Sequence, residues 1–136
     1  MAVVGRIGDT EHFRNILRHE VKTCPETFAV RIDESLYFAN SRELQTCLLS
    51  AATGNKNLKN ILLICSAVNF IDSSALETLE RVIGELESAG VKLYLAEVKG
   101  PVMDLLKAIE FVEKFGEENI FLSTHLAFES LGCKKD

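Results

Sequence analysis

The chain has 136 residues, of which 47% are hydrophobic and 26% are charged, and this is the length and composition of one globular domain with a buried core. Its 15 basic and 20 acidic residues give a net charge of −5, and the basic residues are scattered, so we expect no nucleic-acid binding. The longest apolar run, Ile61 to Val68, is far shorter than the ~20 residues of a membrane span, and the N-terminal residues lack the features of a secretory signal.

Two short strands are predicted in the first third of the chain. The segment from Phe28 to Ile32 alternates apolar and polar residues, and the segment from Leu36 to Phe38 is short, aromatic and apolar. We expect the turn at Asp33 to Ser35 to join the two strands as a hairpin. Val3 to Ile7 is a further candidate strand.

The first predicted helix begins at Asn40. Asn40 and Glu43 have the spacing of a capping box, in which each side chain bonds the backbone N–H of the other residue. Apolar residues then recur at helical spacing as far as Gly54, a residue that commonly ends helices. The next segment, Asn60 to Cys65, is almost uniformly apolar, which predicts a central strand that is covered on both faces.

A second helix and a third strand follow in the order expected for a parallel crossover. The helix shows one apolar stripe and ends near Gly90, and the strand is predicted at Val91 to Glu97. Because a strand, a helix and a strand alternate here, the two strands should be parallel neighbours. The residues of the stripe are Leu76, Leu79, Ile83 and Leu86.

Two more helices are predicted towards the C-terminus. Gly100-Pro101 starts one of them, with proline at the first position, where its missing N–H costs nothing. The segment Asn119 to Ser123 is short and apolar, and Ser123 or Thr124 caps a last helix through Leu131. The residues expected on the buried face of the first of these helices are Val102, Leu105, Leu106 and Ile109.

The alternation of strands and helices predicts an α/β fold, with a small mixed β-sheet of four to five strands packed against about four helices. No convincing catalytic group accompanies it. Gly5 and Gly8 lack the spacing of a phosphate-binding loop, and Ser73 and Ser74 are not in the G-x-S-x-G pattern of hydrolases. The histidines and cysteines form no metal-ligand pattern. We therefore expect no catalytic residues, no metal and no cofactor.

One motif carries a family resemblance. In Asn69 to Arg81, NFIDSSALETLER, an apolar strand is followed by I-D-S-S-A-L and a helix, and this resembles the STAS domain. That family includes stand-alone anti-sigma factor antagonists and the cytoplasmic C-terminal domains of SulP (SLC26-type) anion transporters. The resemblance covers Pro25 to Leu131. Arg31 to Gln45 resembles the R-I-D-x-x-L-Y-F-A-N segment of the transporter branch, and Gly5 to His19 resembles the segment that links its last membrane span to the domain.

The transporter resemblance implies a domain organisation and a function. Residues 1–24 would be a juxtamembrane linker with a possible first strand, and residues 25–136 the STAS domain. The expected function is that of a non-catalytic regulatory and protein-interaction domain of a SulP-type sulfate or anion permease, on the cytoplasmic face of the cell membrane. Its expected partners are the transmembrane domain of the same permease and a cytosolic protein. The resemblance also allows nucleotide binding, although no phosphate-binding motif supports it.

The alternative function is that of a stand-alone anti-sigma factor antagonist switched by serine phosphorylation. In the antagonists that the motif resembles, the second serine is phosphorylated, and its position matches Ser74. Asp72, Ser73 and Ser74 are therefore the candidate regulatory loop. Two helix starts remain open: Ser74 forms a capping box with Glu77, or Asp72 is the N-cap and leaves the Ser74 hydroxyl free for modification.

Overall fold

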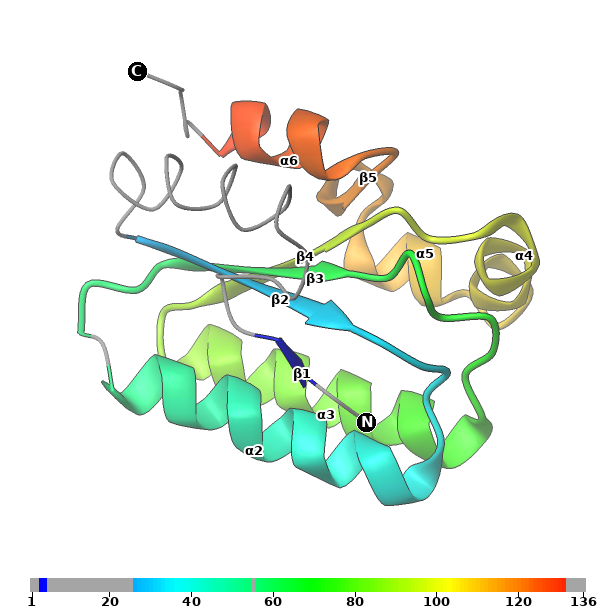
Figure 1. Cartoon of the computed structure of the whole chain (residues 1–136), viewed down its shortest axis with the longest axis horizontal. Helices are drawn as coiled ribbons and strands as arrows, with labels where there is room; N and C mark the ends of the chain where they lie inside the picture. The colour runs from blue at the N-terminus through cyan, green and yellow to red at the C-terminus, as the bar shows by residue number, and fades with distance from the viewer. Residues whose placement is uncertain (1–2, 5–25, 55, 132–136) are drawn as a thin grey trace.

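In a computed structural model of the chain, which describes residues 3–4, 26–54 and 56–131, a five-stranded sheet lies between helices (Figure 1). The strands lie side by side in chain order, with β1 antiparallel to β2 and with β2 to β5 mutually parallel. The predicted α/β fold with a small mixed sheet is confirmed. The strands are β1 (Val3–Val4), β2 (Thr27–Ile32), β3 (Asn60–Ile64), β4 (Lys92–Ala96) and β5 (Ile120–Phe121).

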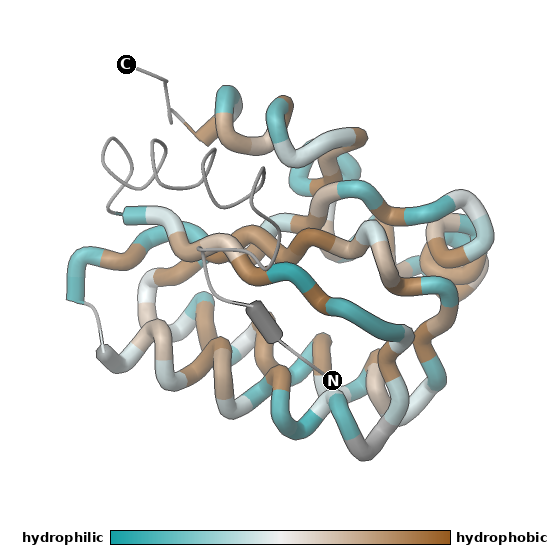
Figure 2. Tube along the Cα trace, viewed as in Figure 1, coloured by the Kyte–Doolittle hydropathy of each residue, from teal (hydrophilic) through white to brown (hydrophobic). Residues whose placement is uncertain are grey.

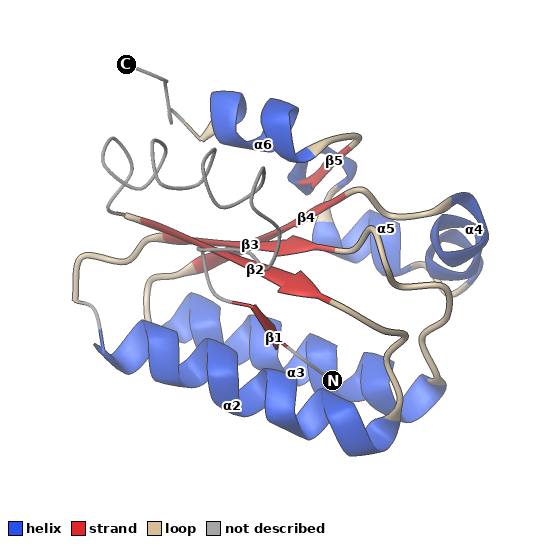
Figure 3. Ribbon diagram, in the orientation of Figure 1, coloured by secondary structure: helices blue, strands red, loops and turns tan. Residues whose placement is uncertain are grey.

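The helices cover the two faces of the sheet unequally. The long helices α2 and α3 lie side by side on one face, and the short helix α6 lies on the other (Figures 1 and 3). This follows from the strand order, because successive right-handed crossovers between adjacent parallel strands place their helices on the same face. The helices are α2 (Phe38–Gly54), α3 (Ser73–Ser88), α4 (Gly100–Ala108), α5 (Phe111–Phe115) and α6 (Thr124–Ser130), and a 3₁₀ turn, η1, spans Glu117–Asn119.

The main core lies between the sheet and helices α2 to α5. It contains alternate residues of the strands, such as Ile61 and Leu63, together with the apolar faces of the helices. Figure 2 shows how the apolar residues concentrate in the central strands. In β3 the four residues Ile61 to Ile64 are all buried, as expected for a strand that is covered on both faces.

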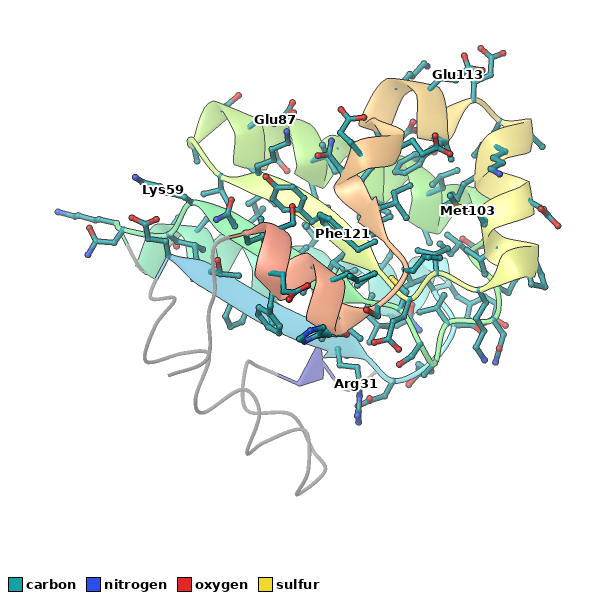
Figure 4. All side chains as sticks on the ribbon, turned by 90° about the horizontal axis from the view of Figure 1, so that it is seen from above. Arg31, Lys59, Glu87, Met103, Glu113 and Phe121 are labelled. Atoms are coloured by element: carbon teal, nitrogen blue, oxygen red, sulfur yellow. The ribbon has the colours of Figure 1, made fainter. Side chains whose placement is uncertain are left out.

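A smaller core lies on the α6 side of the sheet. Leu62 and Ile64 of β3 contact Ala127 and Phe128 of α6 in this second cluster. Phe121, labelled in Figure 4, packs against the same cluster, and its ring centroid is 6.0 Å from that of Tyr94. The apolar residues of the last helix therefore anchor it to the sheet.

The predicted hairpin of Phe28–Ile32 with Leu36–Phe38 is wrong. On one side of β2, Arg31 and Ile32, which a hairpin would pair first, pair with β1 instead, and the other side of β2 pairs with β3. Leu36 instead forms a single parallel bridge with Ile71 and is buried, and Phe38 begins α2. The candidate strand at Val3 to Ile7 is present as β1 at Val3–Val4, and Gly5 to Ile7 lie outside the described residues.

The predicted capping box of Asn40 and Glu43 is also wrong. Helix α2 starts two residues earlier, at Phe38, so Asn40 lies in its first turn. The Asn40 Oδ1 accepts a hydrogen bond from the Tyr37 backbone N–H at 2.8 Å, and its Nδ2 donates to the Ser35 carbonyl at 2.8 Å. Because the helix starts at Phe38, Asn40 takes the role predicted for Glu43: its side chain bonds the backbone N–H of the residue before the helix, Tyr37.

Two predicted apolar faces shift slightly. On α3 the fully buried set includes Val82, whereas Ile83 is only partly buried. On α4 Val102 and Leu106 are buried, but Ile109 follows the end of the helix and is 43% exposed.

Within the described residues no helix is both long and apolar enough to cross a membrane.

Candidate functional site

The loop between β3 and α3 carries the candidate motif and is held against the loop that follows β2. Val68 and Ile71 are buried and anchor the loop in the core. The Leu36 N–H donates to the Phe70 carbonyl at 2.9 Å, and the Asp72 N–H donates to the Leu36 carbonyl at 3.0 Å. These two bonds fix the backbone immediately before α3, at the edge of the sheet where the parallel strands end.

Asp72 is the N-cap of α3. Its backbone is extended, and its Oδ1 accepts a hydrogen bond from the Ala75 N–H at 2.7 Å. Its own carbonyl accepts the first helical bond, from the Leu76 N–H at 3.0 Å. Of the two helix starts that the sequence allowed, the structure has the one capped by Asp72, and the carboxylate also interacts favourably with the positive end of the helix dipole.

Ser73 and Ser74 are therefore the first two residues of the helix rather than its cap. Both are exposed, and Glu77 is exposed one turn further along the same face. The Ser74 carbonyl accepts a hydrogen bond from the Thr78 hydroxyl, so the backbone of Ser74 is fixed within the helix. This arrangement leaves the two serine side chains at the surface, where a partner protein or a modifying enzyme can reach them.

Two exposed aromatic residues, not predicted from the sequence as part of the site, lie on the two connected loops. Tyr37 is 49% exposed and Phe70 is 48% exposed, and their ring centroids are 6.0 Å apart. Each is a chain neighbour of a buried residue of the bridge, Leu36 or Ile71. Adjacent residues in extended backbone point in opposite directions, so the two rings face outward. The alternation of buried and exposed residues in each segment is visible in the sequence. The contact between the two rings is not, because it joins segments that are far apart in the chain.

Polar contacts extend the loop towards β4. The Asn69 N–H donates to the Ser35 hydroxyl at 3.1 Å, and the Lys99 Nζ donates to the Asn69 Oδ1 at 2.8 Å. Lys99 directly precedes α4. The segments that follow β2, β3 and β4 are thereby joined into one surface, which we call the carboxyl edge.

Among the residues that the structure describes, Cys65 is a buried thiol near this edge, and it is a poor candidate for a nucleophile. Cys65 follows β3, and burial, together with the nearby Glu97, raises its pKa to about 12. A thiol with so high a pKa is protonated at neutral pH and is a poor nucleophile. On α2, burial also raises the pKa of Cys47. Cys24 and Cys133, like His12 and His19, lie outside the described residues.

The hollows found in the described part of the chain are not lined by Ser73 or Ser74. A void of about 10 Å³ beneath the loop is lined by apolar side chains such as Val68 and Ile71, and it has room for one water molecule at most. A hollow of about 590 Å³ is lined by residues of α4, α5 and η1, among them Lys107 and Glu117, and it shares no residue with the Asp72–Ser74 loop. Among the residues described, no group of three or more metal-ligating side chains is found.

A family model and several curated relatives match this chain. The family model described as STAS domain matches residues 18–127. Sulfate transporter 1.1 of Arabidopsis thaliana is 29% identical in an alignment 131 residues long, which covers 89% of this chain and 20% of the relative. Probable sulfate transporter 4.2 of the same plant is 30% identical in an alignment 140 positions long, gaps included, which covers 95% of this chain and 21% of the relative. The chain thus spans about a fifth of the length of these relatives.

Solved structures share the fold. The murine anion transporter Slc26a9 matches with a TM-score of 0.70 at 20% identity, over 80% of this chain and 18% of that one. The STAS domain of a SulP transporter from Vibrio cholerae matches with a TM-score of 0.64 at 22% identity, over 78% and 80% of the two chains. The unphosphorylated Anti-Sigma Factor Antagonist SpoIIAA matches with a TM-score of 0.65 at 15% identity, over 82% and 92%. At these identities the likeness concerns the fold.

Proposed function

Because the chain belongs to the STAS domain family, we propose that it is the regulatory domain of a SulP-type sulfate or anion permease, on the cytoplasmic face of the membrane. The observation that carries this proposal is the set of curated relatives, which are sulfate transporters and match nearly the whole chain. In this proposal residues 1–24 form the juxtamembrane linker and residues 25–136 the domain.

The domain would act by contact rather than by chemistry. The STAS family is generally one of non-catalytic regulatory domains. Asp72 and the exposed Ser73 and Ser74 form the start of α3 at the carboxyl edge, where α/β domains commonly bind their ligands and partners. We propose that this loop is the recognition element through which the domain influences transport.

The alternative, a stand-alone antagonist switched at Ser74, has one observation in its favour: both serine side chains are exposed at a helix start. A phosphate on Ser74 would add about −1.5 to −2 charges close to Asp72 and Glu77 and would repel an acidic partner. The coding sequence upstream of Met1 separates the two functions. Several apolar spans of ~20 residues there are expected for the permease, whereas a stop codon and a ribosome-binding site directly upstream would contradict it.

Uptake of radiolabelled sulfate by cells that express the full-length permease tests the role of the loop. Ser73 and Ser88 are the first and last residues of α3, and both are exposed. We expect Ser73→Arg to change the uptake rate at least ~threefold, because it places a bulky cation on the recognition loop, and the matched control Ser88→Arg to leave uptake unchanged. Equal uptake by both variants, at equal surface expression, would contradict the proposed role.

A further inference from the structure

Glu97 is held in an unusual backbone conformation by the segment that carries β5 and α6. Its φ is 59°, in the left-handed region that residues other than glycine rarely adopt. Its N–H donates to the Phe121 carbonyl at 3.0 Å, and its carboxylate accepts hydrogen bonds from the N–H and the hydroxyl of Thr124. These bonds reach one short stretch, residues 121–124, and they stabilise a conformation that is strained by itself.

The segment that supplies these bonds is short and lies at the periphery of the fold. The last strand of the sheet, β5, has two residues, and α6 has seven. Figure 1 shows both elements on the side of the sheet away from the long helices α2 and α3. Short peripheral elements open locally at a lower free energy than a buried core. We therefore expect α6 to open while the central sheet stays intact.

The residues on both sides of Glu97 are bonded to the loop between β3 and α3, residues 65–72, which we call the motif loop. The Ala96 carbonyl accepts a hydrogen bond from the N–H of Cys65, where the motif loop begins, at 2.9 Å. Two residues after Glu97, the Lys99 Nζ donates to the Asn69 Oδ1 at 2.8 Å. The motif loop is thus joined to this connection both before and after Glu97.

Val98 adds a contact inside the core. It lines the same void of about 10 Å³ as Val68 and Ile71, the two residues that anchor the motif loop. The φ angle of Glu97 sets the direction in which the chain leaves β4, because the backbone has only two soft dihedral angles per residue. A change of this angle therefore displaces Val98 and Lys99 relative to the motif loop.

We infer that Glu97 couples α6 to the motif loop as a two-state switch. While α6 is in place, its bonds keep Glu97 left-handed, and the motif loop keeps the arrangement described above. When α6 detaches, Glu97 relaxes to the ordinary range of φ, and Val98 and Lys99 no longer hold the motif loop in that arrangement. By linkage, a partner that fixes the motif loop tightens α6, and a partner that displaces α6 loosens the motif loop. This switch goes beyond the proposed function, because it requires neither a permease nor a kinase.

Amide hydrogen exchange followed by NMR tests the coupling. The amides of Leu36 and Asp72, whose hydrogen bonds fix the motif loop, report on that loop, and the amides of residues 126–130 report on α6. We expect Glu97→Ala to speed exchange in α6 and also, by at least ~twofold, at Leu36 and Asp72. The reason is that alanine loses the bonds to Thr124 and is disfavoured at a positive φ.

Glu97→Asn is the matched variant. Asparagine adopts the left-handed conformation more readily than other residues with a side chain, but its side chain is one methylene shorter than that of glutamate, so the contact with Thr124 is lost. We expect exchange in α6 to rise as in Glu97→Ala, and exchange at Leu36 and Asp72 to stay at the parent rate. Glu97→Gly also tolerates a positive φ and should give the same result.

Ser123→Ala loosens α6 without changing Glu97. It removes the hydrogen bond that caps the Leu126 N–H and should speed exchange in α6. If α6 controls the motif loop, exchange at Leu36 and Asp72 should rise with it by at least ~twofold. In the Glu97→Asn background, the same substitution should speed exchange in α6 alone.

Unchanged exchange of the motif loop in both Glu97→Ala and Ser123→Ala would overturn the inference. An equal rise of loop exchange in Glu97→Ala and Glu97→Asn would also overturn it, because the effect would then come from the lost side chain and not from the backbone. The same applies if Ser123→Ala leaves exchange in α6 unchanged, since α6 would not be the element that opens. None of these measurements depends on sulfate uptake, so the proposed function stands or fails separately.

Discussion

At the start of α3, Asp72 and Ser74 have separate tasks that look interchangeable in sequence. Both are good N-cap residues, and Ser74 even has a glutamate three residues later. The Asp72 N–H is held by the Leu36 carbonyl, which keeps Asp72 in extended backbone and starts the helix after it. The capping carboxylate therefore stabilises the helix, and the serine side chains remain at the surface.

Substitutions at these two positions should differ in their effect on stability. Asp72→Ala removes the hydrogen bond to the Ala75 N–H and should lower the free energy of unfolding by about 1 kcal/mol. Ser74→Ala removes an exposed hydroxyl that does not cap the helix and should stay within about 0.5 kcal/mol of the parent protein. Urea unfolding followed by circular dichroism measures both values, and a larger cost for Ser74→Ala would show that Ser74 is the true cap.

Cys65 gives the protein a dependence of stability on alkaline pH. The pKa of this thiol is raised from an ordinary value of 9.0 to about 12 in the native state, mainly because it is buried. Between these two values the unfolded chain has lost the thiol proton while the native chain keeps it, so stability falls as pH rises. Below about pH 9 both states are protonated and the contribution is constant.

Between about pH 9 and pH 12, the free energy of unfolding should fall more steeply with pH in the parent protein than in Cys65→Ala. The two slopes should differ by up to roughly 1.4 kcal/mol per pH unit. Urea unfolding at several pH values measures it, and the difference between the two proteins cancels the titration of lysines and tyrosines. Parallel pH curves would contradict a buried, neutral Cys65.

At the scale of elements, the position of α6 depends on Glu97, a residue of the connection that follows β4. Glu97, after β4, has a backbone φ of 59°, and its carboxylate accepts hydrogen bonds from the Thr124 N–H and from the Thr124 hydroxyl. Ser123 caps the same helix by accepting from the Leu126 N–H at 3.1 Å. A helix of seven residues has little stability of its own. These contacts and the small core beneath α6 therefore hold it in place.

Glu97→Ala should loosen α6 while the rest of the fold is kept. Losing both bonds at its first turn should speed amide hydrogen exchange in residues 126–130 by roughly fivefold to thirtyfold. Glu110→Ala is the matched control, because Glu110 also has a positive φ, of 63°, but lies before α5. If amide exchange in α6 rises equally in both variants, the rise follows from replacing a residue with positive φ and not from losing the Glu97–Thr124 contact.

At the scale of the whole molecule, the buried core and the exposed apolar side chains lie in different elements. The central strand β3 is buried on both faces, whereas most of the large exposed apolar side chains in the described residues belong to connections or to the start of a helix. Leu62 in β3 is fully buried, and Leu122, directly after β5, is 89% exposed. The sheet supplies the free energy that holds the surface loops in one arrangement.

Leucine-to-alanine substitutions at these two positions should show that the buried leucine contributes to stability and the exposed one does not. Leu62→Ala leaves a cavity between the sheet and α6 and should cost about 2–5 kcal/mol of unfolding free energy. Leu122→Ala should cost less than about 0.5 kcal/mol. Thermal and urea unfolding of both variants measure the difference, and similar costs would mean that Leu122 is covered in solution.

Much of the fold and part of the candidate site follow from local patterns. The apolar run at β3, most of the stripe of α3 and the start of α4 at Gly100-Pro101 are each determined by residues a few positions apart, and these predictions agree with the structure. The proline is the second residue of α4, one position later than predicted. The motif Asp72-Ser73-Ser74 was likewise visible, because a strand, a polar turn and a helix follow one another in the chain.

The tertiary structure alone decided what depends on contacts between distant segments. Leu36–Phe38 has the composition of a strand, but β1 and β3 occupy both edges of β2, and Leu36 is buried instead. The choice of Asp72 over Ser74 as the cap depends on the Leu36 carbonyl, and the Tyr37–Phe70 pair joins two loops. Sequence by itself therefore determined most of the elements, because their signals are local. Packing determined that Leu36–Phe38 does not join the sheet and which side chains remain at the surface.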